Sequence, residues 1–192
     1  MQALVAFRDQ CNAWLVAVKP KLIKLVNRRA GDQAVAELSV LFICTGNICR
    51  SPTAQGIFEH KLAQAGLDRK VFVDSAGTHG FHVGSKPDAR ARRAAARRGF
   101  DLSRQRSRRI EPHDFVKFDY VIGMDYTNMA TLHEQCPAAH RDKLSLLLHF
   151  MPPAELEEVP DPYYGGSEGF ERVLDLLDGA ADALLEDVRR RL

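Results

Sequence analysis

The sequence predicts an α/β domain in which a parallel sheet is covered by helices on both faces. Short apolar runs, typical of buried strands, alternate along the 192-residue chain with segments of helical spacing. The composition, with 45% hydrophobic and 27% charged residues, is that of an ordinary globular domain and excludes disordered, collagen-like and coiled-coil chains. The length accommodates one domain and an appendage.

Apolar runs place the strands and periodic segments place the helices. The first run, 38–44, ends in a turn, and a helix is expected to start near Ser51-Pro52, where a cap-type residue precedes a proline, and to end at Gly66. Further strands are expected at 71–73, 120–122 and 144–148, with a turn at 75–77. Further helices are expected at about 87–99, near 129–132, and from Ser167 as N-cap to about 188.

The first 37 residues are predicted to form a separate helical extension. Two short amphipathic helices are broken at Pro20 and Gly31, and the segment carries a net charge of +3. A hairpin packed on the domain, a dimerisation element and a membrane-surface segment are the three interpretations, and we favour packing or self-association.

Charge and cysteine usage narrow the class of protein. The net charge of +2 gives no reason to expect nucleic acid or an anionic membrane as principal partner, and no apolar stretch is long enough to span a bilayer. Four cysteines, at 11, 44, 49 and 136, are too few for a secreted disulfide framework, so we expect a cytoplasmic protein. A functional cysteine is then expected to be reactive.

The turn after the first strand carries the strongest chemical signal. Cys44 and Arg50 flank five residues, and Ser51 follows at the start of the helix. A loop of this length lets backbone N–H groups surround a tetrahedral anion, with Gly46 expected to supply the unusual torsions. In that electropositive setting Cys44 is favoured as a thiolate, Arg50 is suited to bind phosphate oxygens, and Ser51 to donate to the sulfur.

Phosphoryl transfer to sulfur also needs an acid for the leaving group. Asp161 is the candidate, because Pro160 and Pro162 stiffen its loop. The tyrosines that follow, Tyr163 and Tyr164, are expected to wall the entrance.

Residues 40–55 resemble the signature of the low-molecular-weight protein tyrosine phosphatases. The similarity continues through 74–78, 87–88, 124–125 and 161–164 and covers about residues 38–191. It implies a four-stranded parallel sheet with flavodoxin-like winding in a three-layer αβα domain, here residues 38–192. It also implies hydrolysis of phosphotyrosine through a phosphocysteine intermediate, without metal or other cofactor.

The resemblance assigns roles by motif match. Cys44 becomes the nucleophile, Arg50 the phosphate clamp and Asp161 the acid and base. Asn47 holds the loop's shape, Ser51 steadies the thiolate, and Cys49 is a redox partner for Cys44. The phosphate-binding loop consists of Thr45, Gly46, Asn47, Ile48, Cys49 and Ser51, and the substrate rim of Phe81, His82, Tyr163 and Tyr164. The implied partner is a phosphotyrosine protein, with a tyrosine kinase as a family-based guess.

One position departs from the family pattern. Gln105 stands where the family usually has a histidine that supports the loop asparagine. Glutamine can donate the same hydrogen bond but cannot titrate, so we expect the loop to survive with an altered pH dependence.

Two related activities share this scaffold. Protein arginine phosphatases carry threonine where Ile48 stands and usually lack the tyrosine pair, so phosphotyrosine is favoured. Arsenate reductases need further cysteines downstream, and only Cys136 is present.

A nucleic-acid-binding module is the alternative from another class. Residues 86–109 carry ten basic and two acidic side chains, for a net charge of +8. We favour a solvated helix face that attracts anionic substrate, and expect no nucleic acid partner. The match of 165–169 to G-x-S-x-G lacks a preceding strand, and no zinc-site spacing is present.

Overall fold

The computed structural model describes residues 36–153 and 156–192. The two helices expected before residue 36, and Cys11 with them, lie outside the described residues. Their role in packing or self-association, and the boundary between residues 37 and 38, therefore stay predictions. Residues 36–192 form one compact unit.

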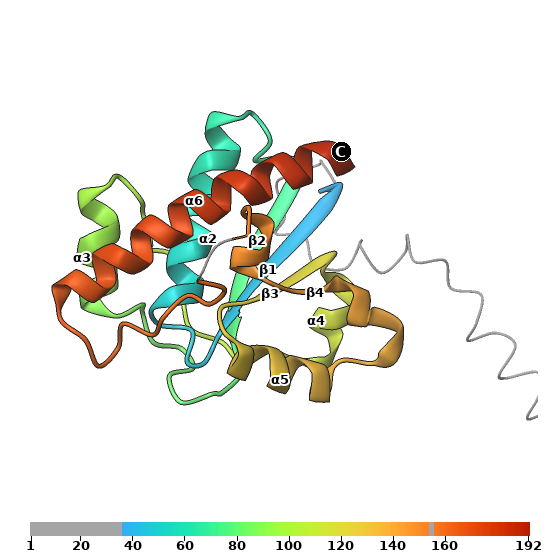
Figure 1. Cartoon of the computed structure of the whole chain (residues 1–192), viewed down its shortest axis with the longest axis horizontal. Helices are drawn as coiled ribbons and strands as arrows, with labels where there is room; N and C mark the ends of the chain where they lie inside the picture. Colours follow the sequence, from blue (N-terminus) through green and yellow to red (C-terminus); the bar gives the residue numbers. More distant parts are fainter. Residues whose placement is uncertain (1–35, 154–155) are drawn as a thin grey trace, which may run out of the picture. The chain divides into compact units, whose positions relative to one another are not determined.

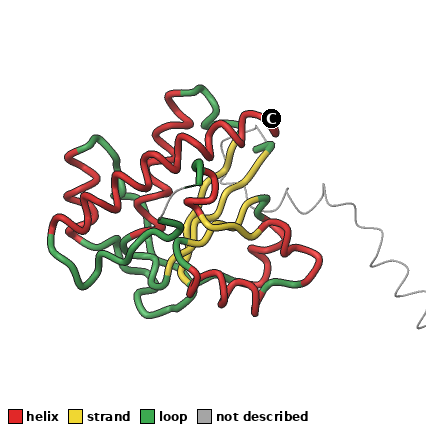
Figure 2. The backbone as a smooth tube through the Cα atoms, viewed as in Figure 1, coloured by secondary structure: helices red, strands yellow, loops and turns green. Residues whose placement is uncertain are grey.

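Four parallel strands form the central sheet, in the order β2-β1-β3-β4 (Figure 1, Figure 2). They are β1 (Leu38–Cys44), β2 (Val71–Gly77), β3 (Tyr120–Gly123) and β4 (Leu144–Leu146). β1 is buried along its whole length because it pairs on both sides. The predicted four-stranded parallel sheet is confirmed, and the winding changes direction at β1, where α/β sheets place their ligands.

Helices cover both faces of this sheet (Figure 1). One face carries α2 (Arg50–Gln64) and α6 (Ser167–Arg191), with α3 (Ala89–Arg97) packed against them. The other carries α4 (Pro112–Lys117) and α5 (Tyr126–Gln135). No described helix is long and apolar enough to cross a membrane.

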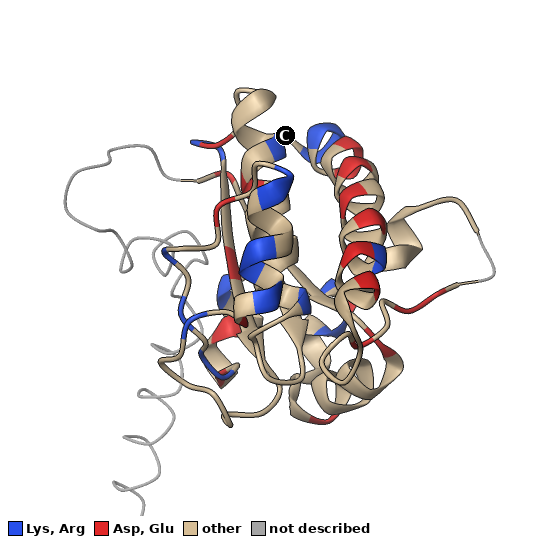
Figure 3. Cartoon of the chain, turned by 90° about the vertical axis from the view of Figure 1, so that its left-hand side faces the viewer, with Lys and Arg blue, Asp and Glu red and all other residues tan. Residues whose placement is uncertain are grey.

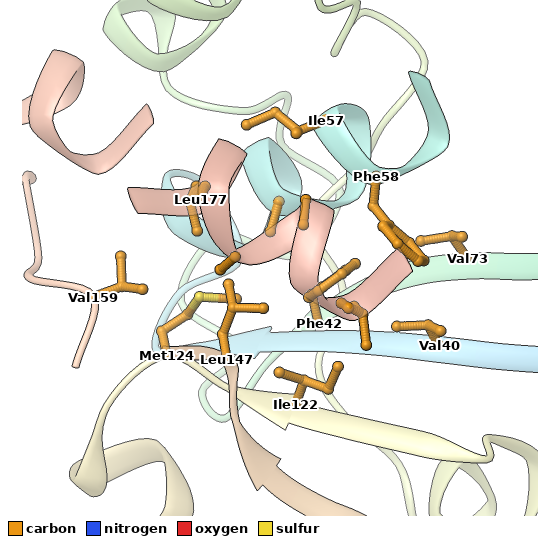
Figure 4. Close-up of a cluster of buried hydrophobic side chains, with 14 of the residues drawn as sticks. Val40, Phe42, Ile57, Phe58, Val73, Ile122, Met124, Leu147, Val159 and Leu177 are labelled. Atoms are coloured by element: carbon orange, nitrogen blue, oxygen red, sulfur yellow. The ribbon is translucent and has the colours of Figure 1, made fainter. Parts of the chain in front are cut away.

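Alternation along β1 divides the core into two clusters. Phe42 faces the α2 and α6 side, where its ring meets that of Phe58 edge-on at 5.8 Å and Leu177 is fully buried (Figure 4). Leu41 and Ile43 face the α4 and α5 side. Each such side chain contributes about 1.5–3 kcal/mol by leaving water. Burial on both faces fixes the position of the carboxyl end of β1, and with it Cys44.

The turn predicted at 75–77 is wrong, because these residues continue β2 and pair with Phe42, Ile43 and Cys44. Their small side chains instead allow the loop after β1 to lie close to β2. A Cβ on Gly77 would lie 2.8 Å from the carbonyl oxygen of Thr45, so glycine lets β2 run beside the loop after β1.

Several predicted boundaries also move. The fourth strand ends at Leu146 and continues as the 3-10 helix η3 (Leu147–Phe150), and the helix expected near 129–132 spans 126–135. Helix α4 and the 3-10 helix η2 (Ala138–Lys143) were not predicted, since both are short. Gly66 and Gly99 end α2 and α3 with φ values of 68° and 85°, as expected for C-terminal glycines.

The predicted helix starts near Ser51 and at Ser167 are confirmed, but neither serine is the N-cap. α2 begins at Arg50, so the hydroxyl of Ser51 faces Cys44 instead of capping the helix. α6 begins at Ser167 after Gly166, with no side chain bonded to its first N–H groups. The cap at α3 is Asp88, which accepts from the N–H of Arg90 at 2.7 Å.

Candidate active site

The loop between β1 and α2 lies at the carboxyl edge of the sheet. Cys44 is the last residue of β1, and Arg50 is the first residue of α2. Backbone bonds from Thr78 to the carbonyl of Cys44 (2.8 Å) and from His79 to that of Thr45 (2.9 Å) brace the loop. The loop therefore holds Cys44 beside the positive end of α2, where an anion is favoured.

Asn47, and not Gly46, takes the unusual torsion in this loop. Its φ is 53°, a left-handed conformation that asparagine tolerates better than most residues. Gly46 serves a different purpose, because a Cβ there would lie 3.1 Å from the His82 ring. Glycine thus lets the loop and the rim approach each other closely.

A hydrogen bond from Ser51 reaches the sulfur of Cys44. The Ser51 Oγ–Sγ distance is 3.0 Å, and both side chains are buried. Ser51 Oγ also accepts from Nδ2 of Asn47 at 2.9 Å, and its own hydrogen has two acceptors in range, the sulfur of Cys44 and the carbonyl of Ala76 at 3.3 Å. This arrangement places a hydrogen-bond donor directly at the sulfur of Cys44.

Asn47 is itself held by groups from distant segments. Its Nδ2 donates to Ser75 Oγ at 2.9 Å, and its Oδ1 accepts from the backbone N–H of Arg108 at 2.9 Å. Ser75 Oγ donates in turn to Gln55 Oε1 at 2.7 Å, and Gln55 donates to Glu59 at 2.9 Å. Every polar group of Asn47, which is 1% exposed, has a partner.

Gln105 does not take over a hydrogen bond to Asn47, yet the loop is formed as expected, and its altered pH dependence stays a prediction. Both polar atoms of the Gln105 side chain are buried without a hydrogen-bond partner in the described chain. It packs instead near Gly56, where a Cβ would lie 3.6 Å from Nε2. Ser75 and the Arg108 backbone already satisfy Asn47, which leaves no hydrogen bond for Gln105 to make.

Arg50 is buried at the bottom of the site and bonded to four groups, the weakest contact being that of Nη2 with Thr45 Oγ1 at 3.4 Å. Its Nη1 donates to Asp125 at 2.5 Å and to the carbonyl of Val159 at 3.1 Å, and its Nη2 donates to Asp161 at 2.8 Å. Burial alone lowers the pKa of Arg50, but the negative charges of Cys44, Asp161 and Asp125 outweigh it and raise the pKa above its ordinary value. The guanidinium stays charged and fixed in orientation.

Asp161 lies across the same opening, with a half-exposed side chain. Its other oxygen accepts from the N–H of Tyr163 at 3.1 Å. The structure thus brings Cys44, Arg50, Ser51 and Asp161 together although 117 residues separate the first from the last.

Aromatic side chains surround the mouth of the pocket, whose volume is about 200 Å³. Phe81 is 74% exposed and its ring stacks on that of His79. Tyr163 and Tyr164 meet edge-on at 5.0 Å, and Tyr164 is 95% exposed. Together with His82, these side chains line a narrow entrance that suits a flat ring above a tetrahedral group.

Cys49 also lines the pocket as a free, buried thiol. Burial, followed by the nearby negative charges of Asp88, Cys44 and Asp161, raises its pKa to about 12. The Cys49 thiol is therefore protonated at neutral pH.

The sequence analysis did not identify Ser75, Gln55, Asp125 or Asn128 as site residues. Asp125 and Asn128 start α5, where Asp125 caps the helix by accepting from the N–H of Asn128 at 2.6 Å. The Asn128 side chain donates to Thr45 Oγ1 at 3.3 Å. Their only signal in the sequence is a polar residue directly after a buried strand. Among the described residues, no group of His, Cys, Asp or Glu is arranged to hold a metal ion.

Comparison with known proteins gives one consistent result. The family described as low molecular weight phosphotyrosine protein phosphatase matches residues 39–192. The low molecular weight protein-tyrosine-phosphatase YfkJ of Bacillus subtilis is 36% identical over 153 residues, which cover 80% of this chain and 97% of that protein. A crystal structure of a protein tyrosine phosphatase from Entamoeba histolytica is 37% identical, with a TM-score of 0.77, over 80% of this chain and 97% of the other.

An arginine phosphatase, YwlE, shares the fold at lower identity. Its structure matches with a TM-score of 0.72 and 24% identity, over 79% of this chain and 96% of the other. At this identity the likeness extends to the fold alone.

Proposed function

The chain belongs to the low molecular weight phosphotyrosine protein phosphatase family, a family of phosphoric monoester hydrolases, and on that premise we propose that it hydrolyses phosphotyrosine in proteins through a phosphocysteine intermediate on Cys44. One observation carries the proposal. The hydroxyl of Ser51 lies 3.0 Å from Cys44 Sγ, in a pocket where Arg50 and Asp161 face each other at 2.8 Å. Nucleophile, phosphate clamp and acid thus share one pocket.

In the first step the Cys44 thiolate attacks phosphorus and the P–O bond to the phenol breaks. Arg50 binds two equatorial oxygens of the phosphoryl group, for which its planar fork is suited. A phosphate that takes this place displaces the Asp161 carboxylate from Arg50, and the freed carboxylate takes up a proton from solvent. Asp161 then protonates the departing phenolate oxygen, which is a poor leaving group without a proton.

In the second step water attacks the phosphocysteine. Asp161, now ionised, accepts a proton from that water, the S–P bond breaks and inorganic phosphate leaves. Ser51 steadies the thiolate that is released. Asn47 and its partners keep Ser51 and the loop in place throughout.

The rim supports an aryl phosphate as the substrate. Phe81, Tyr163 and Tyr164 present ring surface at the entrance, which matches a phosphotyrosine side chain better than a guanidinium. Ile48 lines the same pocket and offers no hydroxyl to a phosphoarginine nitrogen. A tyrosine kinase as substrate and a cytoplasmic location stay predictions from the sequence.

Cys49 is placed to protect Cys44 from irreversible oxidation. Oxidation of Cys44 by hydrogen peroxide gives a sulfenic acid, and the Cys49 thiol then condenses with it to form a disulfide and release water. A dithiol reductant reverses the step. We propose Cys49 as this redox partner, since both thiols line one pocket.

The test is a side-by-side assay on a phosphotyrosine peptide, a phosphoarginine peptide and arsenate, with the Cys44→Ser variant as control. We expect turnover of phosphotyrosine alone, and no turnover by Cys44→Ser although it still binds phosphate. Preferred turnover of phosphoarginine or arsenate reduction would contradict the substrate assignment. Phosphatase turnover by Cys44→Ser would contradict the nucleophile.

A further inference from the structure

A groove separate from the catalytic pocket lies along α3. It has a volume of about 360 Å³ and is lined on one wall by α3 and on the other by residues 100–103. Phe100 and Leu102 provide an apolar lining, and Arg92 and Arg93 lie at its side. One carboxylate, that of Asp101, also lines it and accepts from the N–H of Ser103 at 2.8 Å.

The arginines of α3 fall into two groups. Arg90, Arg97 and Arg98 form ion pairs, with Asp88 in the first case and with acidic residues of α6 in the other two. Figure 3, in which the ribbon is coloured by charge, shows the basic positions of α3 beside the row of acidic positions along α6. Much of the positive charge of segment 86–109 is therefore neutralised by ion pairs within the domain.

Arg92 and Arg93 are different. Residues 89, 92, 93 and 96 share one face of the helix, on the side of the groove. Within the described chain no carboxylate lies in ion-pair distance of either guanidinium, and the Nε of Arg92 donates to the carbonyl of Pro87 at 3.0 Å. Lys86, just before the helix, is exposed and has no ion-pair partner among the described residues. The groove therefore offers cationic groups beside an apolar lining.

Both walls of the groove begin at the phosphate-binding loop. Asp88, directly before α3, donates its N–H to the carbonyl of Ile48 at 2.7 Å. Ser107, four residues beyond the other wall, donates its hydroxyl to the carbonyl of Gly46 at 3.0 Å. Four residues of chain span at most about 13 Å, so the near end of the groove lies within roughly 15 Å of the loop.

We propose that this groove docks an acidic segment of the phosphoprotein substrate while its phosphotyrosine occupies the catalytic pocket. The inference rests on the proposed function. An extended peptide advances about 3.3 Å per residue, so acidic side chains roughly three to six residues from the phosphotyrosine reach Arg92 and Arg93. The apolar lining beside cationic groups fits a peptide with interleaved apolar and acidic residues better than a nucleic acid backbone.

The test compares two double variants of equal charge. The first variant, Arg92→Glu with Arg93→Glu, reverses the charge of the groove. The control, Arg69→Glu with Arg141→Glu, reverses the charge of two exposed arginines elsewhere. They precede the amino ends of β2 and β4, at the edge of the sheet away from the loop. Substrates are p-nitrophenyl phosphate, a phosphotyrosine peptide with glutamates at the third to sixth flanking positions, and the same peptide with glutamines.

We expect the groove variant to raise KM for the glutamate peptide about tenfold at 50 mM salt, with little change in kcat. The effect should shrink at 0.5 M salt, since exposed charges are screened. The KM values for the glutamine peptide and for p-nitrophenyl phosphate should change less than twofold. The control variant should have the kinetic constants of wild type. The Ala96→Trp substitution fills the groove without a change in charge, so it should also weaken binding of the glutamate peptide.

Equal effects of both double variants would overturn the inference, because they would reflect net charge alone. So would equal KM values of wild type for the two peptides, although turnover of both would leave the proposed function intact. Failure of wild type to hydrolyse any phosphotyrosine peptide would instead refute the proposed function. Binding of a single-stranded RNA, but not of the acidic peptide, at Arg92 and Arg93 would assign the groove to nucleic acid.

Discussion

Ser75 provides the sharpest test of the network behind the nucleophile. Its hydroxyl accepts from Asn47 and donates to Gln55, and replacement by alanine leaves one amide hydrogen and one amide oxygen without a partner. Asn47 and Gln55 are 1% and 9% exposed, so water reaches neither group easily. An unsatisfied buried polar group costs about 1–3 kcal/mol, so the free energy of unfolding should fall by roughly 2–4 kcal/mol.

The same change should weaken the nucleophile. Without Ser75, Asn47 keeps its bonds to Arg108 and Ser51 but loses one of its three side-chain partners. The amide that donates to Ser51 is then held less firmly, which weakens the orientation of the Ser51 hydroxyl toward Cys44. A hydrogen bond to a charged group contributes about 1.5–3 kcal/mol, and partial loss of it predicts a three- to tenfold slower alkylation of Cys44.

The assay measures unfolding in urea and, under native conditions, the rate at which iodoacetamide modifies the Cys44 peptide at pH 6. Ser39→Ala is the matched control. Its hydroxyl is also largely buried and donates to Asp119 at 2.7 Å, far from the loop. It should lose stability without slower alkylation. If Ser75→Ala loses stability but keeps wild-type alkylation and activity, the network is structural only, and the reasoning is refuted.

Three further predictions concern single side chains. Asp161→Ala should reduce kcat most for aryl phosphates with high leaving-group pKa values, and an equal loss for all leaving groups would exclude its role as acid. Gln105→Met removes two unpartnered buried polar atoms and should leave stability unchanged or raise it by about 1 kcal/mol; a clear drop in Tm would show that Gln105 has a partner. The hydrogen bond from Tyr120 lowers the pKa of Asp187 below its ordinary 3.8, so its contribution is present above that pH and lost as the pH falls through the folded pKa. Asp187→Asn should therefore cost about 1 kcal/mol at pH 7 and progressively less as the pH falls below 3.8, and a difference in urea unfolding that stays constant over this fall would contradict the coupling.

Local sequence was enough for the loop and for most of the fold. The apolar run 38–43, the spacing of Cys44 and Arg50 and the glycines at 66 and 99 depend on neighbours within a few residues, and the structure places each as expected. Short elements such as α4 were missed because six residues carry little periodic signal.

Local signals also misled where tertiary contacts compete with them. Residues 75–77 have turn composition, but β1 offers them a complete row of backbone partners, and their small size allows the loop to approach. Ser51 looks like a helix cap, yet its hydroxyl is bonded to Cys44 and Asn47. In both cases the sequence analysis correctly singled out these residues, but it assigned them the wrong structural role.

By itself, the sequence determined the strands and the position of the loop after β1, and it predicted Cys44 and Arg50 as site residues, because a strand, a turn and a helix start are encoded by adjacent residues. Asp161 was predicted from the prolines on either side of it. Only the tertiary structure decided which side chains and backbone groups form hydrogen bonds with the residues of the loop after β1. Ser75 and Arg108 reach Asn47 from 28 and 61 residues away, and Asp125 reaches Arg50 from 75. Side-chain partners across such separations follow from how strands and helices pack, which no local pattern records. The same packing divides the arginines of α3 into those paired with carboxylates and those that line the groove.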